Sequence, residues 1–287
     1  MPSHNAVVDL GAAFETLRPR LIRIAYRMLG SVAEAEDIVQ DAWLRWTAKD
    51  RASVRDPKAF LARIVTRLCL DHMKSARVRR ETYPGTWLPE PVVELVEDED
   101  DDLTLTLMMA LERLSPLERA AFLLHDVFDV NFEEVASILD RDPASCRKLA
   151  SRARDHVRES RPRYPVPEDR GRSIAEAFFQ ASRSGDPTAL QSLLAEDVII
   201  YSDGGGIRSA ALNPIYGRDK TVRFFVGIAE KAGMPPVHRI ENINGLPGII
   251  TIEADDLPQT VTLDIKEGLI TAIYIMRNPD KLRHLMV

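Results

Sequence analysis

The chain has 287 residues, 45% of them hydrophobic, and a net charge of −6, which is ordinary for a soluble protein of two or three domains. It does not open with a basic segment before an apolar run, and no apolar stretch reaches the ~18 residues of a membrane span, so we expect a cytoplasmic protein without membrane association. Cys69 and Cys146 lie far apart on apolar sides of predicted helices, which favours buried, reduced thiols over a disulfide or metal site.

The charge is unevenly distributed along the chain. Residues 1–80 carry 15 basic and 9 acidic groups, residues 81–102 carry 9 acidic and no basic groups, and residues 103–163 balance at 10 and 10. A basic N-terminal segment, an acidic segment and a helical segment with a basic end indicate a protein whose parts bind different partners.

Residues 9–80 have the pattern of an all-helical domain. Apolar residues recur at three- and four-residue steps up to Gly30, which ends the first helix, and Ser31 can cap the second. One face of this second helix is polar and carries Asp37, Gln40 and Asp41. A solvated edge and a partner surface both fit this face, whereas catalysis or a metal would need a His or third carboxylate at suitable spacing.

A polar loop from Thr47 to Asp56 leads to a third helix, which Pro57 opens. One flank and the end of this helix are charged and mostly basic. They carry Arg63, Arg67, Asp71, Lys74, Arg77, Arg79 and Arg80. Such a flank can follow a nucleic-acid backbone. The alternative is a solvated basic helix end, which a second basic helix downstream makes less attractive.

Residues 81–102 are predicted to be a linker. Three prolines obstruct a helix, and seven acids between Glu94 and Asp102 cannot fold on one another. Tyr83, Trp87 and Leu88 are large apolar groups within it, so part of the linker is expected to dock on another surface.

Residues 103–161 predict a second helical domain. Ser115, Pro116 and Glu118 combine a capping Ser, a first-turn Pro and a reciprocal Glu. Farther on, Asn131 caps a short helix, and after a tight turn Asp142 caps another. Two short helices across a tight turn are typical of a helix-turn-helix.

The second of these helices is basic. Residues 141–163 hold eight Lys or Arg against three acids, a local balance of +5. Outward residues near its start are candidates for base edges: Arg147, Lys148, Ser151 and Arg152. Farther along are candidates for backbone phosphates: Arg154, Arg158, Arg161 and Arg163. A basic amphipathic helix that pairs with a protein remains the alternative.

A proline-rich hinge at 162–171 precedes a C-terminal domain, residues 172–287. Helices are expected at 174–183, 187–194 and 218–231, and strands at 198–201 and in four later runs rich in Val, Ile and Thr. Helices before a mostly antiparallel curved sheet form an α+β domain.

These motifs converge on a known family. AEDIVQDAWLRW, a basic helix ending LDHMKS, an acidic linker, LERLSPLERAAFLLHDVF and a helix-turn-helix ending ASRAR resemble, in order, regions 2 and 4 of extracytoplasmic-function (ECF) sigma factors. TWLPEP, DGGG and NPDKL further resemble the ECF subgroup with a C-terminal SnoaL-like domain. The resemblance implies a multidomain protein: two separate all-α domains, sigma region 2 and the sigma region 4 helix-turn-helix, plus a C-terminal α+β NTF2-like/SnoaL-like cone domain.

The resemblance also implies partners: core RNA polymerase, through its β′ clamp helices and β flap, and promoter DNA, with no cofactor. Asp37, Gln40 and Asp41 would then meet the clamp helices. The loop from Thr47 to Asp56 would open the −10 element together with Arg63, Arg67, Asp71 and Lys74. The −35 element would be contacted by Arg147, Lys148, Ser151, Arg152 and Arg154. The acidic linker would thread toward the active-site cleft and the RNA exit path.

For the C-terminal domain, the resemblance implies a regulatory role that involves Asp203, Gly204, Gly205 and Gly206. Two alternatives stay open. One is a SnoaL-type enzyme tethered to a DNA-binding module, for which Asp203, Tyr201 and His238 are the available polar groups, although a tight turn also requires an Asp before glycines. The other is a sensor that takes an unknown small ligand into its pocket.

Overall fold

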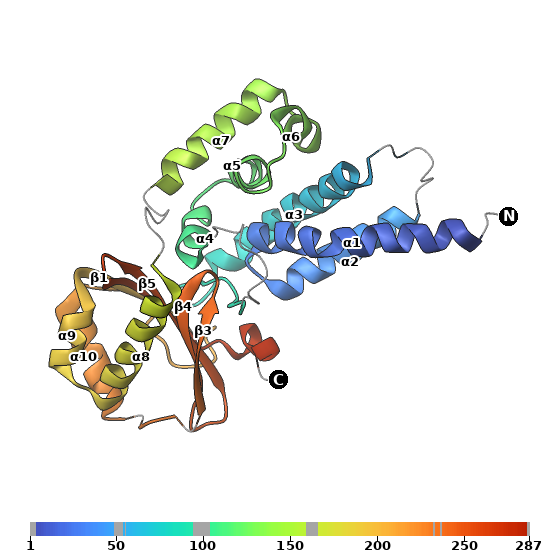
Figure 1. Cartoon of the computed structure of the whole chain (residues 1–287). Helices are drawn as coiled ribbons and strands as arrows, with labels where there is room; N and C mark the ends of the chain where they lie inside the picture. The colour runs from blue at the N-terminus through green and yellow to red at the C-terminus, as the bar shows by residue number, and fades with distance from the viewer. Residues whose placement is uncertain are drawn as a thin grey trace. The chain divides into compact units, whose positions relative to one another are not determined.

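The computed structural model describes residues 4–48, 54, 56–93, 104–158, 166–231, 233–235 and 237–285. The chain forms two compact units, one comprising residues 1–79 and 110–159 and the other comprising residues 80–109 and 160–287. Figure 1 shows helices in the first unit and a sheet with helices in the second. Among the described residues, no helix combines the length and apolar character needed to cross a bilayer.

The first unit is built from helices. They are α1 (His4–Leu29), α2 (Val32–Thr47), α3 (Pro57–Glu81), α5 (Pro116–Phe122), the π-helical turn η2 (Leu123–Val127), α6 (Phe132–Leu139) and α7 (Pro143–Val157). One more helix, α4 (Leu105–Leu111), spans the boundary between the two units in the sequence. The apolar stripes read from the sequence are buried, as at Leu29, Trp46 and Val157.

A buried arginine joins the two helical segments of this unit. Arg119 is 2% exposed, and its Nη1 donates to the carbonyl oxygen of Met28 at 2.8 Å and to Glu112 at 2.7 Å. Its Nε and Nη2 donate to the carbonyl oxygen of Leu111 at 3.0 and 2.7 Å. A buried guanidinium needs such partners. Residues 1–79 and 110–159 therefore share one compact unit.

The predicted helix boundaries are confirmed where local chemistry defines them. Gly30 follows α1 with φ of 71°, and the Ser31 side chain accepts from the α2 backbone. Ser115 and Glu118 form the predicted capping box of α5, and Asp142 caps α7. Both cysteines are buried free thiols, as predicted.

The second unit is an α+β domain. Its elements are α8 (Glu168–Ser184), α9 (Pro187–Leu193), β1 (Leu194–Asp203), β2 (Ile215–Tyr216), α10 (Arg218–Ala229), β3 (Val237–Ile243), β4 (Leu246–Ile252), β5 (Pro258–Lys266), β6 (Leu269–Met276) and the 3-10 turns η4 (Pro279–Lys281) and η5 (Arg283–Leu285). The six strands form one sheet in the order β2-β1-β6-β5-β4-β3. Among the described strands, only β1 and β6 pair in parallel, and the other pairs are antiparallel. This agrees with the predicted, mostly antiparallel sheet.

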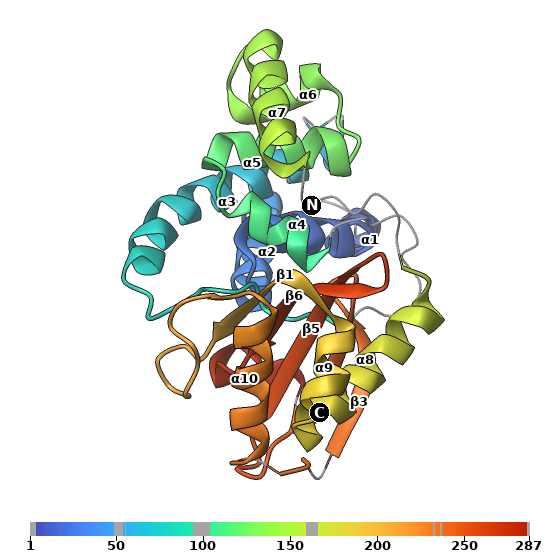
Figure 2. The same ribbon diagram turned by 90° about the vertical axis from the view of Figure 1, so that its left-hand side faces the viewer.

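The two faces of this sheet are covered differently. Helices α8, α9 and α10 lie over one face (Figure 2), where Ile273 and Ile275 of β6 enter the main core. Tyr274 and Met276, which alternate with them, point to the opposite face. There they pack with apolar residues from three other segments: Leu88, Leu105, Leu282 and Leu285. The linker thus covers one face of the C-terminal sheet.

One segment boundary differs from the sequence expectation. Helix α8 begins at Glu168, so the last four residues of the predicted hinge 162–171 are helical. Residues 104–109 group with the C-terminal unit, and the amide of Leu105 donates to the carbonyl oxygen of Asn244 at 2.9 Å. The acidic residues 94–102 and the hinge residues 162–165 lie outside the described residues.

Candidate nucleic-acid interface and linker-binding site

Helices α6 and α7 form the predicted helix-turn-helix. Asn131 caps α6, Asp140 takes the left-handed conformation that ends it, and Asp142 caps α7 directly before Pro143. The side-chain hydroxyl and amide of Ser145 both donate to Asp142, which lowers the pKa of that carboxyl from its ordinary value. The caps fix where α7 starts and therefore which side chains face outward.

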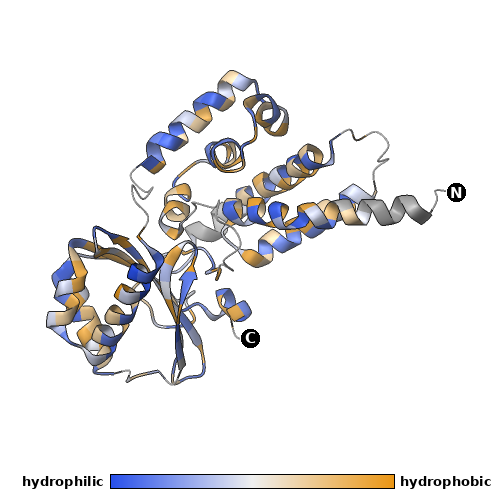
Figure 3. Ribbon diagram, viewed as in Figure 1, coloured by the Kyte–Doolittle hydropathy of each residue, from blue (hydrophilic) through white to orange (hydrophobic). Residues whose placement is uncertain are grey.

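The predicted DNA-contacting residues of α7 are on its outer face. Arg147, Lys148, Ser151 and Arg152 are all exposed, while Cys146, Ala150 and Ala153 are buried beneath them. Figure 3 shows hydrophilic residues along much of α7. The structure therefore brings the four candidates for base edges together on one accessible surface.

Two arginines of α7 have partners within the unit. The Arg147 guanidinium lies 5.6 Å from the centre of the Phe132 ring, and its Nη2 lies 3.5 Å from Glu133. Nε of Arg154 donates to Asp126 at 2.6 Å. Asp126 is largely buried, so Arg154 is held against the η2 turn and is less free to meet phosphate than its neighbours. Arg161 and Arg163 lie outside the described residues.

The basic flank of α3 is only partly free. Arg63 is half-buried, Nε of Arg67 donates to the carbonyl oxygen of Ile138 at 3.2 Å, and Lys74 donates to Asp71 at 2.8 Å. That bond lowers the pKa of Asp71. Most of the loop from Thr47 to Asp56, and the side chains of Arg77, Arg79 and Arg80, lie outside what the structure describes.

The polar face of α2 is exposed as predicted. Asp37, Gln40 and Asp41 all lie at the surface, with Asp37 one turn before the other two. Leu44, one turn farther on, is 56% exposed. Leu44 was not among the residues predicted for this face. A leucine outside the buried stripe of an otherwise amphipathic helix was the available signal.

Asp203 is the centre of a buried polar cluster. Its side chain is 0% exposed and accepts four hydrogen bonds. At Oδ1 the donors are the Tyr83 hydroxyl at 2.6 Å and the Gly205 amide at 3.0 Å. At Oδ2 they are the Leu88 amide at 2.9 Å and Nζ of Lys281 at 2.8 Å. Two of the four donors belong to the linker, so this carboxylate holds the linker on the C-terminal unit.

Lys281 closes the cluster from the other side. Its Nζ also donates to the carbonyl oxygen of Leu88 at 2.6 Å and lies 4.1 Å from the centre of the Trp87 ring and 5.0 Å from that of Tyr83. Nδ2 of Asn278 donates to the Tyr83 hydroxyl at 2.8 Å. Burial and the neighbouring carboxylate of Asp203 raise the pKa of Tyr83 well above its ordinary value.

A second contact fixes the linker farther along. Asn244 lies in the turn between β3 and β4. Its side-chain oxygen accepts from the backbone amide of Val92 at 3.0 Å, and its backbone amide donates to the carbonyl oxygen of Val92 at 2.9 Å. The ring Nε2 of His284 lies 2.7 Å from the carbonyl oxygen of Pro91. The linker is thus held at both ends of residues 83–92.

The three glycines after Asp203 are required by close approach and by backbone conformation. A side chain on Gly204 would place its Cβ 2.1 Å from the carbonyl oxygen of Arg208. Gly205 and Gly206 have φ of 65° and 72°. A Cβ on Gly206 would lie 2.7 Å from the ring of Pro84 in the linker. The glycines therefore let this turn pass close to the linker.

The polar groups considered for catalysis do not converge. Asp203 faces the linker, Tyr201 stacks on Tyr274, and His238 stacks on Phe179 at 4.3 Å between ring centres. Among the described residues, no three His, Cys, Asp or Glu side chains gather as a metal site would require.

The sequence matches two family models, one over the N-terminal helices and one over the segment that contains the helix-turn-helix. Residues 13–79 match Sigma-70 region 2, and residues 104–157 match Sigma-70, region 4. A helical unit carrying these two regions defines the class of bacterial sigma factors, and the predicted fold class is confirmed.

Relatives that span nearly the whole chain narrow this class. The chain is 39% identical to the ECF RNA polymerase sigma factor SigJ of Mycobacterium tuberculosis, over 93% of this chain and 91% of the relative. It is 31% identical to the probable ECF RNA polymerase sigma factor SigI of M. tuberculosis, over 98% and 97%. The crystal structure of M. tuberculosis SigJ matches with a TM-score of 0.78 at 37% identity, covering 95% of this chain and 98% of that one. The chain belongs to the ECF RNA polymerase sigma factor family.

Proposed function

We propose that this chain directs core RNA polymerase to a two-part promoter and that its C-terminal unit controls this activity by holding the linker. The observation that carries the first half is the accessible basic face of α7 within a region 4 segment that follows a region 2 segment. Arg147, Lys148, Ser151 and Arg152 would read the −35 element, with Arg154 and Arg158 near the phosphates.

The −10 element is assigned to the α3 flank. Arg63, Arg67, Asp71 and Lys74 would act there, together with the loop from Thr47 to Asp56. Arg67 is exposed but donates through Nε to the carbonyl oxygen of Ile138, so turning its guanidinium wholly toward DNA would break this bond. Because that acceptor is the end of α6, engagement of DNA by α3 would change the contact between α3 and the helix-turn-helix.

The polymerase surface is assigned to α2. Asp37, Gln40 and Asp41 would face the clamp helices of the β′ subunit, with exposed Leu44 adding apolar contact at the end of the same face. The β flap would meet the region 4 segment.

In vitro transcription is the deciding experiment for the first half of the proposal. The chain is added to core polymerase on the DNA upstream of its own gene, and transcripts and core binding are measured. We expect a defined transcript that depends on the chain. Absence of core binding would reject the proposal.

The regulatory half rests on the buried cluster at Asp203. A linker held between Asp203 and Asn244 is not available to extend toward the polymerase cleft. Truncation after residue 170 is a poor test, because it would expose Leu88 and Leu105, which are 1% and 5% exposed. Point variants at Asp203 and Gly206 are better. Transcription that is unchanged by every such variant would remove the regulatory role.

An enzymatic role for the C-terminal unit is less well supported. Asp203, the candidate carboxylate, is saturated by four hydrogen bonds and does not line the cavity that lies between α8, α10 and the sheet. The activity we propose for this unit is therefore control of the sigma segments.

A further inference from the structure

A cavity of about 520 Å³ lies between helices α8 and α10 and the sheet of the C-terminal unit. This size suits a drug-sized ligand. Its apolar wall is made by Phe178, Phe179, Phe224, Phe225, Ile249 and Ile275. Such a wall accepts a hydrocarbon or aromatic body, and the exposed Ser209 and Lys231 mark the opening to solvent.

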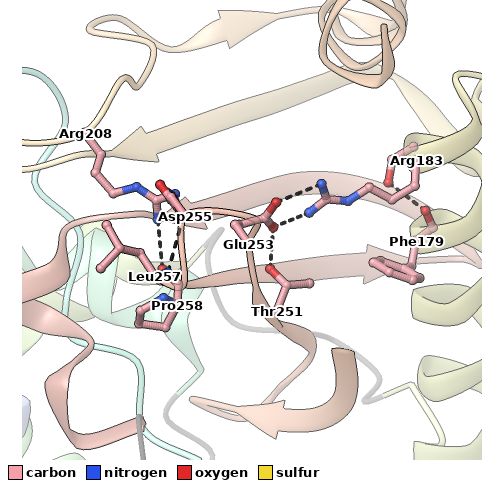
Figure 4. A network of polar contacts seen from close by, with 9 residues as sticks. Phe179, Arg183, Arg208, Thr251, Glu253, Asp255, Leu257 and Pro258 are labelled. Carbon is pink, nitrogen blue, oxygen red and sulfur yellow. Dashed lines mark hydrogen bonds and ion pairs between the residues drawn. The ribbon is translucent and has the colours of Figure 1, made fainter. Parts of the chain in front are cut away.

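One polar pair in the cavity is already neutralised (Figure 4). Both Nη atoms of Arg183 donate to the carboxylate of Glu253, and the Thr251 hydroxyl donates to the same carboxylate at 2.6 Å. The two charged side chains are only 8% and 12% exposed. Because each satisfies the other, this pair shapes the cavity without leaving a net charge for a ligand.

Arg277 is different, because a donor on it is unused. Its Nη1 donates to the carbonyl oxygen of Ser209, while its buried Nε has no hydrogen-bond partner among the described residues. Burial, followed by the nearby positive charge of Arg208, lowers the pKa of Arg277 from its ordinary value. Arg208 itself is bound to Asp255 at 2.8 Å and to the carbonyl oxygen of Pro258 at 3.0 Å (Figure 4).

A half-buried guanidinium that lines an apolar cavity and has one buried, unused N–H donor is a site for an anion. We propose that the cavity binds an amphipathic organic acid, whose acidic group pairs with Arg277 and whose apolar body contacts the phenylalanine wall. Lys231 at the opening adds a second positive charge. The inference rests on the proposed function only for its regulatory consequence.

That consequence follows from the alternation of β1 and β6. Ser202 and Arg277 line the cavity, whereas the next residues, Asp203 and Asn278, hold the linker on the opposite face. The amides of Arg277 and Asn278 both donate to the carbonyl oxygen of Asp203, at 2.7 and 3.0 Å. A ligand that moves Arg277 therefore acts directly on the residues that retain the linker.

Binding is tested on the full chain without polymerase, using two fluorescent probes of nearly the same body. Anilinonaphthalene sulfonate is an anion, and N-phenylnaphthylamine is neutral. We expect one site per chain and at least about tenfold tighter binding of the anion. Arg277→Gln should remove this preference, Arg277→Lys should keep most of it, and Arg223→Gln, on the exposed side of α10, should leave it unchanged.

Equal affinity of the wild-type chain for the two probes would overturn the proposal, as would full anion binding by Arg277→Gln. Thermal unfolding checks that each variant is folded. If Arg277→Gln does not fold, the ratio of the two probe affinities is measured in Arg277→Lys. Loss of the preference for the anion in that variant would count against the proposal.

The link to the linker has its own measurement. Chymotryptic cleavage of the Trp87–Leu88 bond requires release of the buried Leu88, so its rate reports how firmly the linker is held. We expect the anionic probe to change this rate in the wild type but not in Arg277→Gln. An unchanged rate with the probe bound would overturn the link. Failure of binding would leave the transcription experiment above unaffected.

Discussion

Nζ of Lys281 lies 2.8 Å from Oδ2 of Asp203, and the two side chains are 9% and 0% exposed. The pair is separated by 78 residues in sequence and meets around the linker amide and carbonyl of Leu88. A buried ion pair adds little stability compared with a pair of well-packed hydrophobic side chains. Removing one partner is nevertheless costly, because the other charge is left buried and unpaired. The pair is therefore sensitive to single substitutions.

Asp203→Asn should destabilise the C-terminal unit by about 3 kcal/mol, because Lys281 would be left as a buried cation without its carboxylate. Denaturant unfolding measures this loss, and hydrogen exchange of residues 83–93 should become faster. Glu196→Gln is the matched control, because its pair with Arg218 is at the surface and should contribute less than about 1 kcal/mol. Equal effects of the two variants would contradict the assigned role of Asp203.

Gly206→Ala should loosen the linker, because Gly206 has φ of 72° and a Cβ there would lie 2.7 Å from Pro84. The backbone strain alone amounts to roughly 1–2 kcal/mol. Gly227→Ala, in the middle of α10 with nothing within 4 Å of the added Cβ, should instead stabilise by about 0.5–1 kcal/mol. Thermal unfolding of the two variants tests this difference in sign.

Arg147→Ala and Arg152→Ala should each weaken binding to the preferred −35 sequence by about 1–3 kcal/mol, with much less effect on other DNA. Binding of polymerase holoenzyme to matched promoters, with and without a mutated −35 element, measures this. Arg223→Ala, in α10, is a control with the same change of charge. Equal loss on all sequences would make these arginines phosphate contacts.

Asp41→Arg should weaken binding to core polymerase at least about tenfold, because a charge on the proposed docking face is reversed. Glu36→Arg makes the same change at another exposed position of α2 and should have a smaller effect. Competition with the wild-type chain for core polymerase gives the ratio. If the two variants bind alike, the docking face lies elsewhere.

The buried Tyr83 hydroxyl should make the stability of the protein depend on pH in the alkaline range. Its pKa is raised in the folded protein by burial and by Asp203, so its contribution to stability is fully present below its unfolded pKa of about 10 and is lost as the pH rises beyond that value. The free energy of unfolding should fall more steeply above about pH 10 in the wild type than in Tyr83→Phe. Parallel curves would show that the hydroxyl contributes nothing to linker binding.

Local chemistry made much of the fold predictable. Ser115 and Asp142 mark their helices because capping involves residues only three positions apart, and the later strands appear in the sequence as runs rich in Val, Ile and Thr. The two-residue strand β2 was missed, because two residues are too short to form a recognisable β-rich run.

The linker contact was only half predictable. Tyr83, Trp87 and Leu88 indicated that the linker docks, yet the partner of Tyr83 lies 120 residues away and leaves no local pattern. For the same reason Asp203 was open to interpretation as a turn residue, a regulatory residue or a catalytic one. The outward face of α7 needed no such information, since helix periodicity alone places Arg147 and Arg152.

The apolar cluster of Leu88, Leu105, Tyr274 and Leu285 has a consequence for modular engineering. A gene segment beginning at the first residue of α8 would encode a domain with one bare sheet face, prone to self-association. A chimera that transplants this control element to another sigma factor must therefore carry residues 80–109 along with it. The natural unit of exchange is discontinuous in sequence, with the helix-turn-helix inserted into it.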